Sequence, residues 1–253
     1  MKQLSPYLKA RTVEELWEYH TCHMAEFGFD RLIYAYTCFQ SAQSLTNPED
    51  ALVLTNYPSD YIEAYIGKGL FRDAPMMKWA SRNVGAISWR HMWDDPDDEM
   101  PGPDRRELLA LNRRFGITVG YTVSFPMAIK RSAAGIGLAA RDGLTQADVD
   151  ALWAEKGDEL EIINQVAHLA ITQLPATGQS RVLTPRQSEV LELVADGKSV
   201  RDIALLLGRK AATVDKHLRG ARESLGVETT AQAVRKASVL NQIFIVEPGS
   251  QLT

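Results

Sequence analysis

The spacing of hydrophobic positions divides the chain into a mixed part and a purely helical part. In the mixed part, residues 31–39 (RLIYAYTCF) are rich in aromatic and β-branched side chains, which is typical of a strand. Residues 118–125 (TVGYTVSF) alternate between hydrophobic and polar side chains, and this period of two also indicates a strand. Two further short strands are predicted at 51–56 and 135–140.

Hydrophobic side chains also recur every three to four residues, which predicts amphipathic helices. The expected helices cover 12–27, 58–67, 75–83, 104–115 and 145–173. Strands that are flanked by helices and joined by short turns favour a mostly antiparallel sheet between helical layers. The first part of the chain is therefore expected to fold as an α+β domain.

A break in this pattern separates the first part from the rest. The segment 175–182 holds a proline, a glycine and several small polar residues after a long helical pattern, as a linker does. We therefore predict a first domain at 1–174, a linker at 175–182, a second domain at 183–245 and a tail at 246–253.

Four short helices are predicted after the linker, with no strand signal of comparable strength. Thr184 and Gln187 form a capping-box pattern before the first helix, and Ser199 and Asp202 do the same before the second. A turn that contains Gly208 leads into the third helix. Two short helices joined in this way are typical of a helix-turn-helix, whose second helix enters the major groove of DNA. A plain helical bundle is the alternative.

The net charge at first argues against a nucleic-acid partner. The 253 residues carry 28 Lys and Arg against 32 Asp and Glu, a formal charge of -4. This average hides two different parts, because residues 181–241 carry 11 basic and 7 acidic side chains and so a charge of +4. Within this basic part, Lys216, Arg219 and Arg222 follow at three-residue spacing on a helix face apart from Leu218. Such an arrangement of cations suits phosphates and base edges, which favours DNA as the partner.

Signals for export, membrane insertion and enzyme chemistry are absent from the sequence. Its first residues lack the apolar core of a signal peptide, and no run approaches the roughly 18 apolar residues of a membrane helix. With two cysteines, Cys22 and Cys38, we expect a soluble, cytoplasmic protein without membrane contact. No nucleophile elbow or phosphate loop occurs, so neither enzyme activity nor a cofactor is expected. His20, Cys22 and His23 resemble a metal cluster but have no evident further ligands, so no metal site is expected.

The segment from 183 to 227 resembles the LuxR-type helix-turn-helix. It reads LTPRQSEVLELVADGKSVRDIALLLGRKAATVDKHLRGARESLGV, and the short sequence motifs of that family occur in it in the family's order. Gln187 replaces the usual Glu, and Lys210 replaces the Ser that usually caps the recognition helix, which should cost about 1 kcal/mol. The resemblance and the charge pattern predict DNA contacts by Thr184, Lys198, Lys210, Thr213, Lys216, Arg219 and Arg222.

A second resemblance covers the first domain. Residues 56–89, NYPSDYIEAYIGKGLFRDAPMMKWASRNVGAISW, are similar to the pocket segment of autoinducer-binding domains, which sense acyl-homoserine lactones. The later FG-x-x-x-G of that family is present at 115–120. The resemblance implies an α-β-α sandwich with a five-stranded antiparallel sheet. It also implies a ligand site formed by Tyr57, Tyr61, Tyr65, Asp73, Pro75 and Trp89.

Two positions depart from the autoinducer-binding pattern. Tyr61 replaces a Trp that donates to the lactone carbonyl in the family, although a Tyr hydroxyl also donates. Ala74 replaces the Asp that accepts from the ligand amide, and Asp73 stands one residue early. A buried ligand amide without a partner would lose roughly 1 to 3 kcal/mol. We therefore expect a small amphipathic ligand more firmly than an acyl-homoserine lactone; plain core packing of the tyrosines is the alternative.

These patterns together predict a DNA-binding transcriptional regulator that is controlled by a small ligand. We expect a homodimer, because helix-turn-helix proteins of this kind read two half-sites about 34 Å apart; the apolar stripes of 145–173 and 230–243 are the candidate dimer surfaces. The expected partners are double-stranded operator DNA, the ligand and RNA polymerase. Three alternatives stay open: a ligand-independent regulator whose first domain only supports dimerisation, a regulator of a non-lactone ligand, and a degenerate enzyme joined to a DNA module.

Overall fold

The computed structural model describes residues 4–37, 51–92, 103–128, 132–174 and 182–244. The chain divides into two compact units, of which the first comprises Met1–Leu8 and Trp17–Ala170, and the second comprises Lys9–Leu16 and Ile171–Thr253. Most of the predicted linker, the predicted tail and Cys38 lie outside the described residues, so the predicted domain limits stay predictions. None of the helices in the described ranges has the length and apolar character that crossing a membrane requires.

A five-stranded antiparallel sheet lies at the centre of the first unit. Its strands are β1 (Phe29–Thr37), β2 (Ala51–Thr55), β3 (Gly85–Ser88), β4 (Gly120–Ser124) and β5 (Ala133–Ala140). They follow the order β2-β1-β5-β4-β3, and every neighbouring pair is antiparallel. The predicted sheet is confirmed. The hydrophobic pattern alone does not predict β3, because four residues are too few for a period to show.

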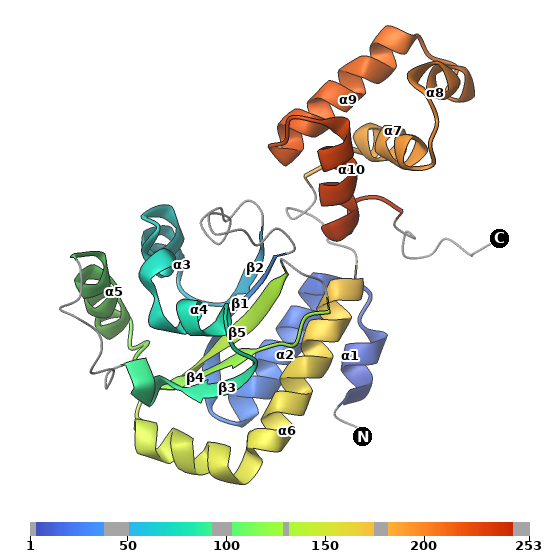
Figure 1. Ribbon diagram of the computed structural model, residues 1–253. Helices are drawn as coiled ribbons and strands as arrows, with labels where there is room; N and C mark the ends of the chain where they lie inside the picture. Colours follow the sequence, from blue (N-terminus) through green and yellow to red (C-terminus); the bar gives the residue numbers. More distant parts are fainter. Residues whose placement is uncertain (1–3, 38–50, 93–102, 129–131, 175–181, 245–253) are drawn as a thin grey trace. The chain divides into compact units, whose positions relative to one another are not determined.

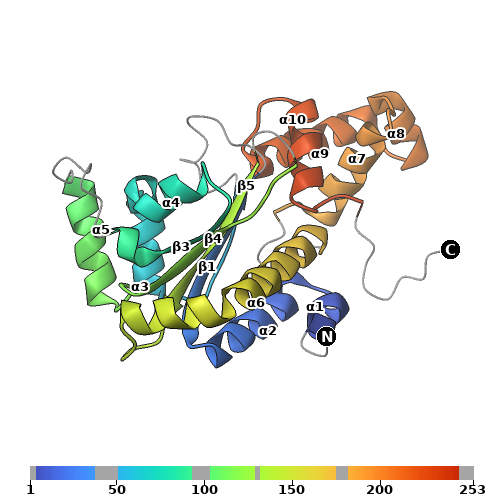
Figure 2. The same ribbon diagram turned by 60° about the horizontal axis from the view of Figure 1, so that its bottom comes forward.

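Helices cover both faces of this sheet (Figure 1, Figure 2). On one face lie α2 (Val13–Glu26) and α6 (Gln146–Gln173), with α1 (Ser5–Lys9) beside them. The other face is covered by α3 (Ser59–Ile62), the π-helical turn η4 (Glu63–Gly67), the 3₁₀ turn η5 (Leu70–Asp73), α4 (Pro75–Ala80) and α5 (Pro103–Arg114). A last 3₁₀ turn, η6 (Trp89–Met92), follows β3. This is the α-β-α sandwich that the family resemblance implies.

Toward α2 and α6 the sheet presents large side chains that form a closed core. Leu32 and Tyr34 of β1 pair with Leu138 and Ile136 of β5, and all four side chains are at most 2% exposed. From the part of α6 that belongs to this unit, the buried residues include Val149, Leu160, Ile163 and Ala167. The Tyr34 hydroxyl lies 2.9 Å from Nδ1 of His168, which gives the buried hydroxyl its hydrogen bond.

Tyr7 of α1 contacts the two histidines of the suspected metal cluster. Its hydroxyl lies 2.8 Å from Nδ1 of His20 and 3.1 Å from Nδ1 of His23. The other ring nitrogen of His20 lies 3.2 Å from Oδ1 of Asn164. Burial lowers the pKa of His20 to about 3, so the ring is neutral at physiological pH. Within the described ranges, no three His, Cys, Asp or Glu side chains are grouped as metal ligands, and Cys22 is exposed.

The opposite face of the sheet carries small side chains. On β5, Ala133, Gly135 and Gly137 alternate with the residues that face α6, so they lie on this side. The neighbours of the two glycines on β1 are Ala35 and Ile33. Because alanine and glycine occupy little volume, space remains between this part of the sheet and the helices that cover it.

The second unit is the predicted group of four helices. They are α7 (Pro185–Ala195), α8 (Val200–Leu206), α9 (Ala211–Leu225) and α10 (Thr230–Val239). The capping boxes predicted at Thr184 and Ser199 are both present, so the start of α7 and of α8 is fixed by local sequence. Lys210 precedes α9 without a side-chain cap, as its replacement of the usual Ser predicts.

One hydrophobic core joins these four helices. The residues of α9 that the pattern places in it are buried, namely Val214, Leu218, Ala221 and Leu225. In α8 the spacing of apolar residues predicts a buried side made of Ile203, Ala204, Leu206 and Leu207. For Leu206 this is wrong, because it is 61% exposed. It ends a helix of seven residues, and the next residue, Leu207, packs against the core instead.

Candidate ligand pocket and DNA-binding surface

A cavity of about 150 Å³ lies on the small-residue face of the sheet. Ile33, Ala35, Gly135 and Gly137 contribute its floor, and α3, η4, α4 and α5 supply its walls. The described side chains that line it are mostly aliphatic or aromatic, and none of them is charged. An apolar cavity with a few polar groups is the usual form of a small-molecule site.

Three predicted ligand residues form one wall of this cavity. Tyr57, Tyr61 and Tyr65 are at most 8% exposed, and all three line it. The rings of Tyr57 and Tyr61 meet edge to face with centroids 5.1 Å apart, whereas Tyr61 and Tyr65 stack at 5.4 Å. Four-residue spacing over α3 and η4 places Tyr61 and Tyr65 on one side of the helical segment, and Tyr57 stands just before α3 begins. Burial raises the pKa of all three hydroxyls, so each stays protonated.

The turn before α4 brings one more predicted ligand residue, Pro75, to the cavity, together with Ala74. Ala74 is buried and Pro75 takes the first position of α4, and both line the cavity. Asp73 ends η5 directly before them, and its side chain lies outside the described part of the structure. A contact between Asp73 and a ligand therefore stays a prediction.

Trp89 forms a further wall and is 4% exposed. Its Nε1–H donates to Oγ1 of Thr122 at 2.8 Å. The ring lies against the backbone of Gly120, where an added Cβ would stand 3.0 Å from the indole and 2.1 Å from the carbonyl oxygen of Leu138. The last glycine of the FG-x-x-x-G pattern thus makes room for the indole.

Asn112 is a polar residue of the cavity that the sequence patterns do not single out. It lies on α5, is 6% exposed, and accepts a hydrogen bond from the Tyr61 hydroxyl at 2.8 Å through Oδ1. It stands four residues after Leu108, a buried residue of the same helix. That spacing on the apolar side of a predicted helix is the signal that could have found it.

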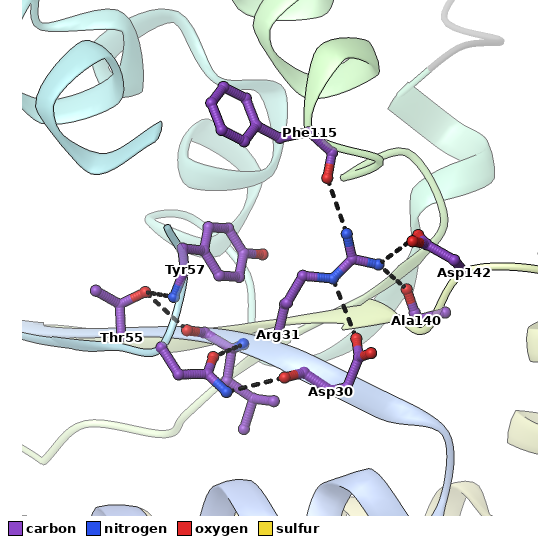
Figure 3. Close-up of polar contacts among 9 residues, drawn as sticks. Asp30, Arg31, Thr55, Tyr57, Phe115, Ala140 and Asp142 are labelled. Atoms are coloured by element: carbon purple, nitrogen blue, oxygen red, sulfur yellow. Dashed lines mark hydrogen bonds and ion pairs between the residues drawn. The ribbon is translucent and has the colours of Figure 1, made fainter. Parts of the chain in front are cut away.

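Arg31 of β1 holds the turn that follows α5 (Figure 3). Its guanidinium donates to the carbonyl oxygen of Phe115 at 2.8 Å and to that of Ala140 at 2.6 Å. It also lies 3.1 Å from one carboxylate oxygen each of Asp30 and Asp142. The ring of Phe115 packs against the tyrosine wall, so Arg31 helps to fix the cavity from outside. No pattern in the sequence distinguishes Arg31 from any other polar residue of a predicted strand.

Side chains of Thr55 and Asn56 attach the NYP segment to β1. The Thr55 hydroxyl donates to the carbonyl oxygen of Leu32 at 2.9 Å and accepts from the amide of Tyr57 at 3.0 Å (Figure 3). Asn56 accepts from the amide of Leu32 at 2.6 Å and donates to the carbonyl oxygen of Asp30 at 2.8 Å. These bonds continue the pairing beyond the end of β2 and fix the backbone that carries Tyr57.

Helix α9 presents predicted DNA contacts on the side away from its core. Lys216 and Arg219 are exposed, and Thr213 is half-buried. Val214 and Leu218 lie on the opposite, buried side. The two cations are three residues apart, so they are neighbours on the helix surface. This is the placement that a recognition helix requires.

The other predicted contacts lie around the helix starts and the end of α9. Lys198 and Lys210 are exposed just before α8 and α9 begin. The Thr184 hydroxyl caps α7. Arg222 is half-buried and its Nη1 donates to Oγ1 of Thr230 at 3.0 Å, so the expectation that it shares the exposed face of Lys216 and Arg219 is wrong. Contact of any of these residues with DNA stays a prediction.

Comparison with known families assigns both units. Residues 12–171 match the autoinducer binding domain, and residues 181–237 match the bacterial regulatory proteins of the luxR family. The chain therefore belongs to the LuxR family of bacterial regulatory proteins, with an autoinducer-binding domain before its helix-turn-helix. It is a ligand-controlled, DNA-binding transcriptional regulator.

Individual relatives support this assignment. The transcriptional activator protein EchR of Dickeya chrysanthemi is 23% identical over 246 residues, which cover 87% of this chain and 88% of EchR. RpaR of Rhodopseudomonas palustris, named an HTH-type quorum sensing-dependent transcriptional regulator, is 27% identical over 76% of this chain and 75% of its own. The crystal structure of Escherichia coli SdiA shares the fold, with a TM-score of 0.52 and 17% identity over 96% of this chain and 97% of SdiA.

Proposed function

We propose that the first unit binds a small amphipathic signal of the acyl-homoserine lactone type and thereby controls operator binding by the second unit. The observation that carries this proposal is the uncharged cavity beside Tyr57, Tyr61 and Tyr65. Its apolar walls suit an acyl chain, and its hydroxyl and amide groups suit a polar head. SdiA has been solved in complex with octanoyl-rac-glycerol, and CepR2 of Burkholderia cenocepacia is described as N-acylhomoserine lactone dependent.

The cavity supports this proposal over a domain that serves dimerisation alone. Protein interiors are normally packed to high density, and an unfilled space lowers stability. A domain that served dimerisation alone would have no need of an apolar cavity between its sheet and helices, whereas a ligand site requires one.

Thermal unfolding with and without ligand tests the ligand proposal. All five tryptophans precede residue 175, so tryptophan fluorescence in the full chain reports on the first unit. A ligand at about 100 times its Kd should stabilise the unit by about 2.7 kcal/mol. The probes are acyl-homoserine lactones with short, medium and long chains, and 1-octanoylglycerol. Stabilisation by the glyceride alone would establish a non-lactone ligand, and stabilisation by none of them would favour the scaffold.

For the DNA-binding surface, the test is a gel-shift titration with Lys216→Ala plus Arg219→Ala. Each base or phosphate contact contributes roughly 1 to 3 kcal/mol, so the double variant should lose at least about tenfold in affinity. Lys9→Ala plus Arg106→Ala removes the same charge from exposed positions outside the helix-turn-helix and is the matched control. Undiminished binding by the first variant would exclude α9 as the recognition helix.

A homodimer is part of the proposal, because a palindromic operator requires two recognition helices. The predicted apolar stripe of α6 is buried, with Leu160 and Ile163 at most 3% exposed, so it is not available to a second copy. On another face of α6, Ile162 and Leu169 are 57% and 52% exposed and stand seven residues apart. We expect Ile162→Glu to shift the chain toward the monomer in light scattering coupled to size exclusion. An unchanged mass would place the dimer contact elsewhere.

The proposal also covers the setting in which the regulator acts. We place it in the cytoplasm, where operator DNA and RNA polymerase are available, and we expect RNA polymerase to contact the DNA-bound form. Regulation then proceeds by binding alone, without catalysis and without a cofactor other than the signal. Pull-down of RNA polymerase on operator DNA, with and without the regulator, tests this partner.

A further inference from the structure

The polar groups that line the cavity differ in whether they still have an unbonded hydrogen-bond donor. Trp89 has one N–H, and it is already bonded to Thr122. The Tyr61 hydroxyl has one hydrogen, and it points to Oδ1 of Asn112 at 2.8 Å. Tyr61 stands where a ligand donor is expected from the sequence, yet its hydrogen is engaged within the protein.

Asn112 retains donors for a ligand. Its Nδ2 carries two N–H groups, and neither has a hydrogen-bond acceptor among the residues that the structure describes. The side chain is 6% exposed and lines the cavity between apolar residues such as Leu108 and Ile117. Because Asn112 lines the cavity, an acceptor that enters the cavity can bond to these N–H groups.

The lining also restricts the charge of the ligand. The described lining residues include no Lys, Arg or His that could pair with a buried anion. Arg31 is near the tyrosine wall, but its guanidinium is engaged by two carbonyl oxygens and two carboxylates. A carboxylate head would therefore enter without a counter-ion, which disfavours it strongly.

From these contacts we infer that Asn112, beside the hydroxyls of Tyr57 and Tyr65, selects the head group, and that it selects an uncharged head with a carbonyl oxygen, such as a lactone or an ester. Tyr61 orients the amide through its hydroxyl, and Nδ2 of Asn112 donates to the carbonyl. The inference rests on the proposed ligand-binding function of this cavity.

Titration calorimetry on the full chain tests this selection with four probes of one chain length. They are N-octanoyl-homoserine lactone, 1-octanoylglycerol, octanol and octanoate. The wild type should bind at least one carbonyl-bearing, uncharged probe about tenfold or more tighter than octanol and octanoate. Asn112→Leu should reduce that preference to within about twofold and leave the affinity for octanol unchanged. Asn164→Leu is the matched control, because Asn164 is equally buried but bonds to His20 and Leu160 elsewhere.

The possible outcomes distinguish the role of Asn112 in head-group selection from the proposed ligand binding itself. If Asn112→Leu still prefers the uncharged, carbonyl-bearing probes over octanol and octanoate, the role of Asn112 is wrong, whereas the ligand-binding function is supported. Octanoate bound as tightly as the ester would overturn the uncharged head. No binding of any probe by the wild type would overturn the ligand proposal and the inference with it. If tryptophan fluorescence shows that Asn112→Leu does not fold, Asn112→Ala decides, since it also removes both N–H groups and adds no other donor.

Discussion

Replacement of Arg31 by methionine should destabilise the first unit by about 3 kcal/mol. The substitution keeps an unbranched side chain of similar length and removes every donor. It therefore isolates the bonds that the guanidinium makes to Phe115, Ala140 and the two aspartates. We expect the turn after α5 to loosen and ligand affinity to fall as a consequence.

The magnitude follows from how exposed each partner is. Asp30 and Asp142 are 46% and 88% exposed, and ion pairs of exposed carboxylates contribute about 0 to 1 kcal/mol each. The Arg31 side chain itself is 16% exposed, and hydrogen bonds from a charged group to a carbonyl contribute about 1.5 to 3 kcal/mol each. Some of this is recovered by water at a site that is not fully closed. The two carbonyl bonds thus account for most of the expected loss.

Urea unfolding followed by tryptophan fluorescence measures this loss in the full chain. Asp142→Asn should change the free energy of unfolding by less than about 0.5 kcal/mol, because it removes only an exposed ion pair. Arg31→Lys keeps the charge but not the planar fork, so it should lie between Arg31→Met and the wild type. A loss in Asp142→Asn equal to that in Arg31→Met would refute the reasoning, since the ion pair would then outweigh the carbonyl bonds.

Three further predictions concern pH, packing and capping. Lowering the pH from 7 to 5.5 should reduce the stability of the first unit by about 2 kcal/mol. Burial lowers the pKa of His20 to about 3 and of His168 to about 4, so the unfolded chain takes up protons first; a flat profile in urea titrations would contradict this. Gly120→Ala should cost at least about 2 kcal/mol through its clash with the Leu138 carbonyl, whereas Gly67→Ala, with open space around the new Cβ, should be near neutral; equal thermal midpoints would be inconsistent with this packing. Lys210→Ser should stabilise α9 by about 1 kcal/mol by supplying the missing cap, measured as slower amide exchange at the helix start; unchanged exchange would argue against it.

Features set by neighbouring residues could be predicted from the sequence. The capping boxes at Thr184 and Ser199 depend on residues three positions apart, and the buried side of α9 depends on a period of three to four. The placement of Tyr61 and Tyr65 is likewise local, because both lie on the helical segment that α3 and η4 form, and Tyr57 stands two residues before it. Such patterns need no knowledge of the tertiary fold.

Features that depend on distant partners could not be predicted. Tyr61 bonds to Asn112, 51 residues away, and Arg31 bonds to Phe115 and Ala140 at separations of 84 and 109 residues. No sequence spacing relates these pairs, because only the closed sheet and its covering helices bring them together. The exposure of Leu206 also depends on the tertiary fold, because the positions of the neighbouring helices decide which side of α8 is covered.

The small side chains of β5 have a consequence for the amount of this protein in a cell. The apolar cavity of about 150 Å³ beside Gly135 and Gly137 gives a ligand a site in the folded chain that the unfolded chain lacks. A signal that binds there stabilises the folded chain by mass action, and proteases degrade unfolded chains. We therefore expect the half-life in pulse-chase labelling to lengthen as the concentration of the signal rises. Turnover would then set a threshold concentration of the signal, below which too little regulator survives to occupy its operators.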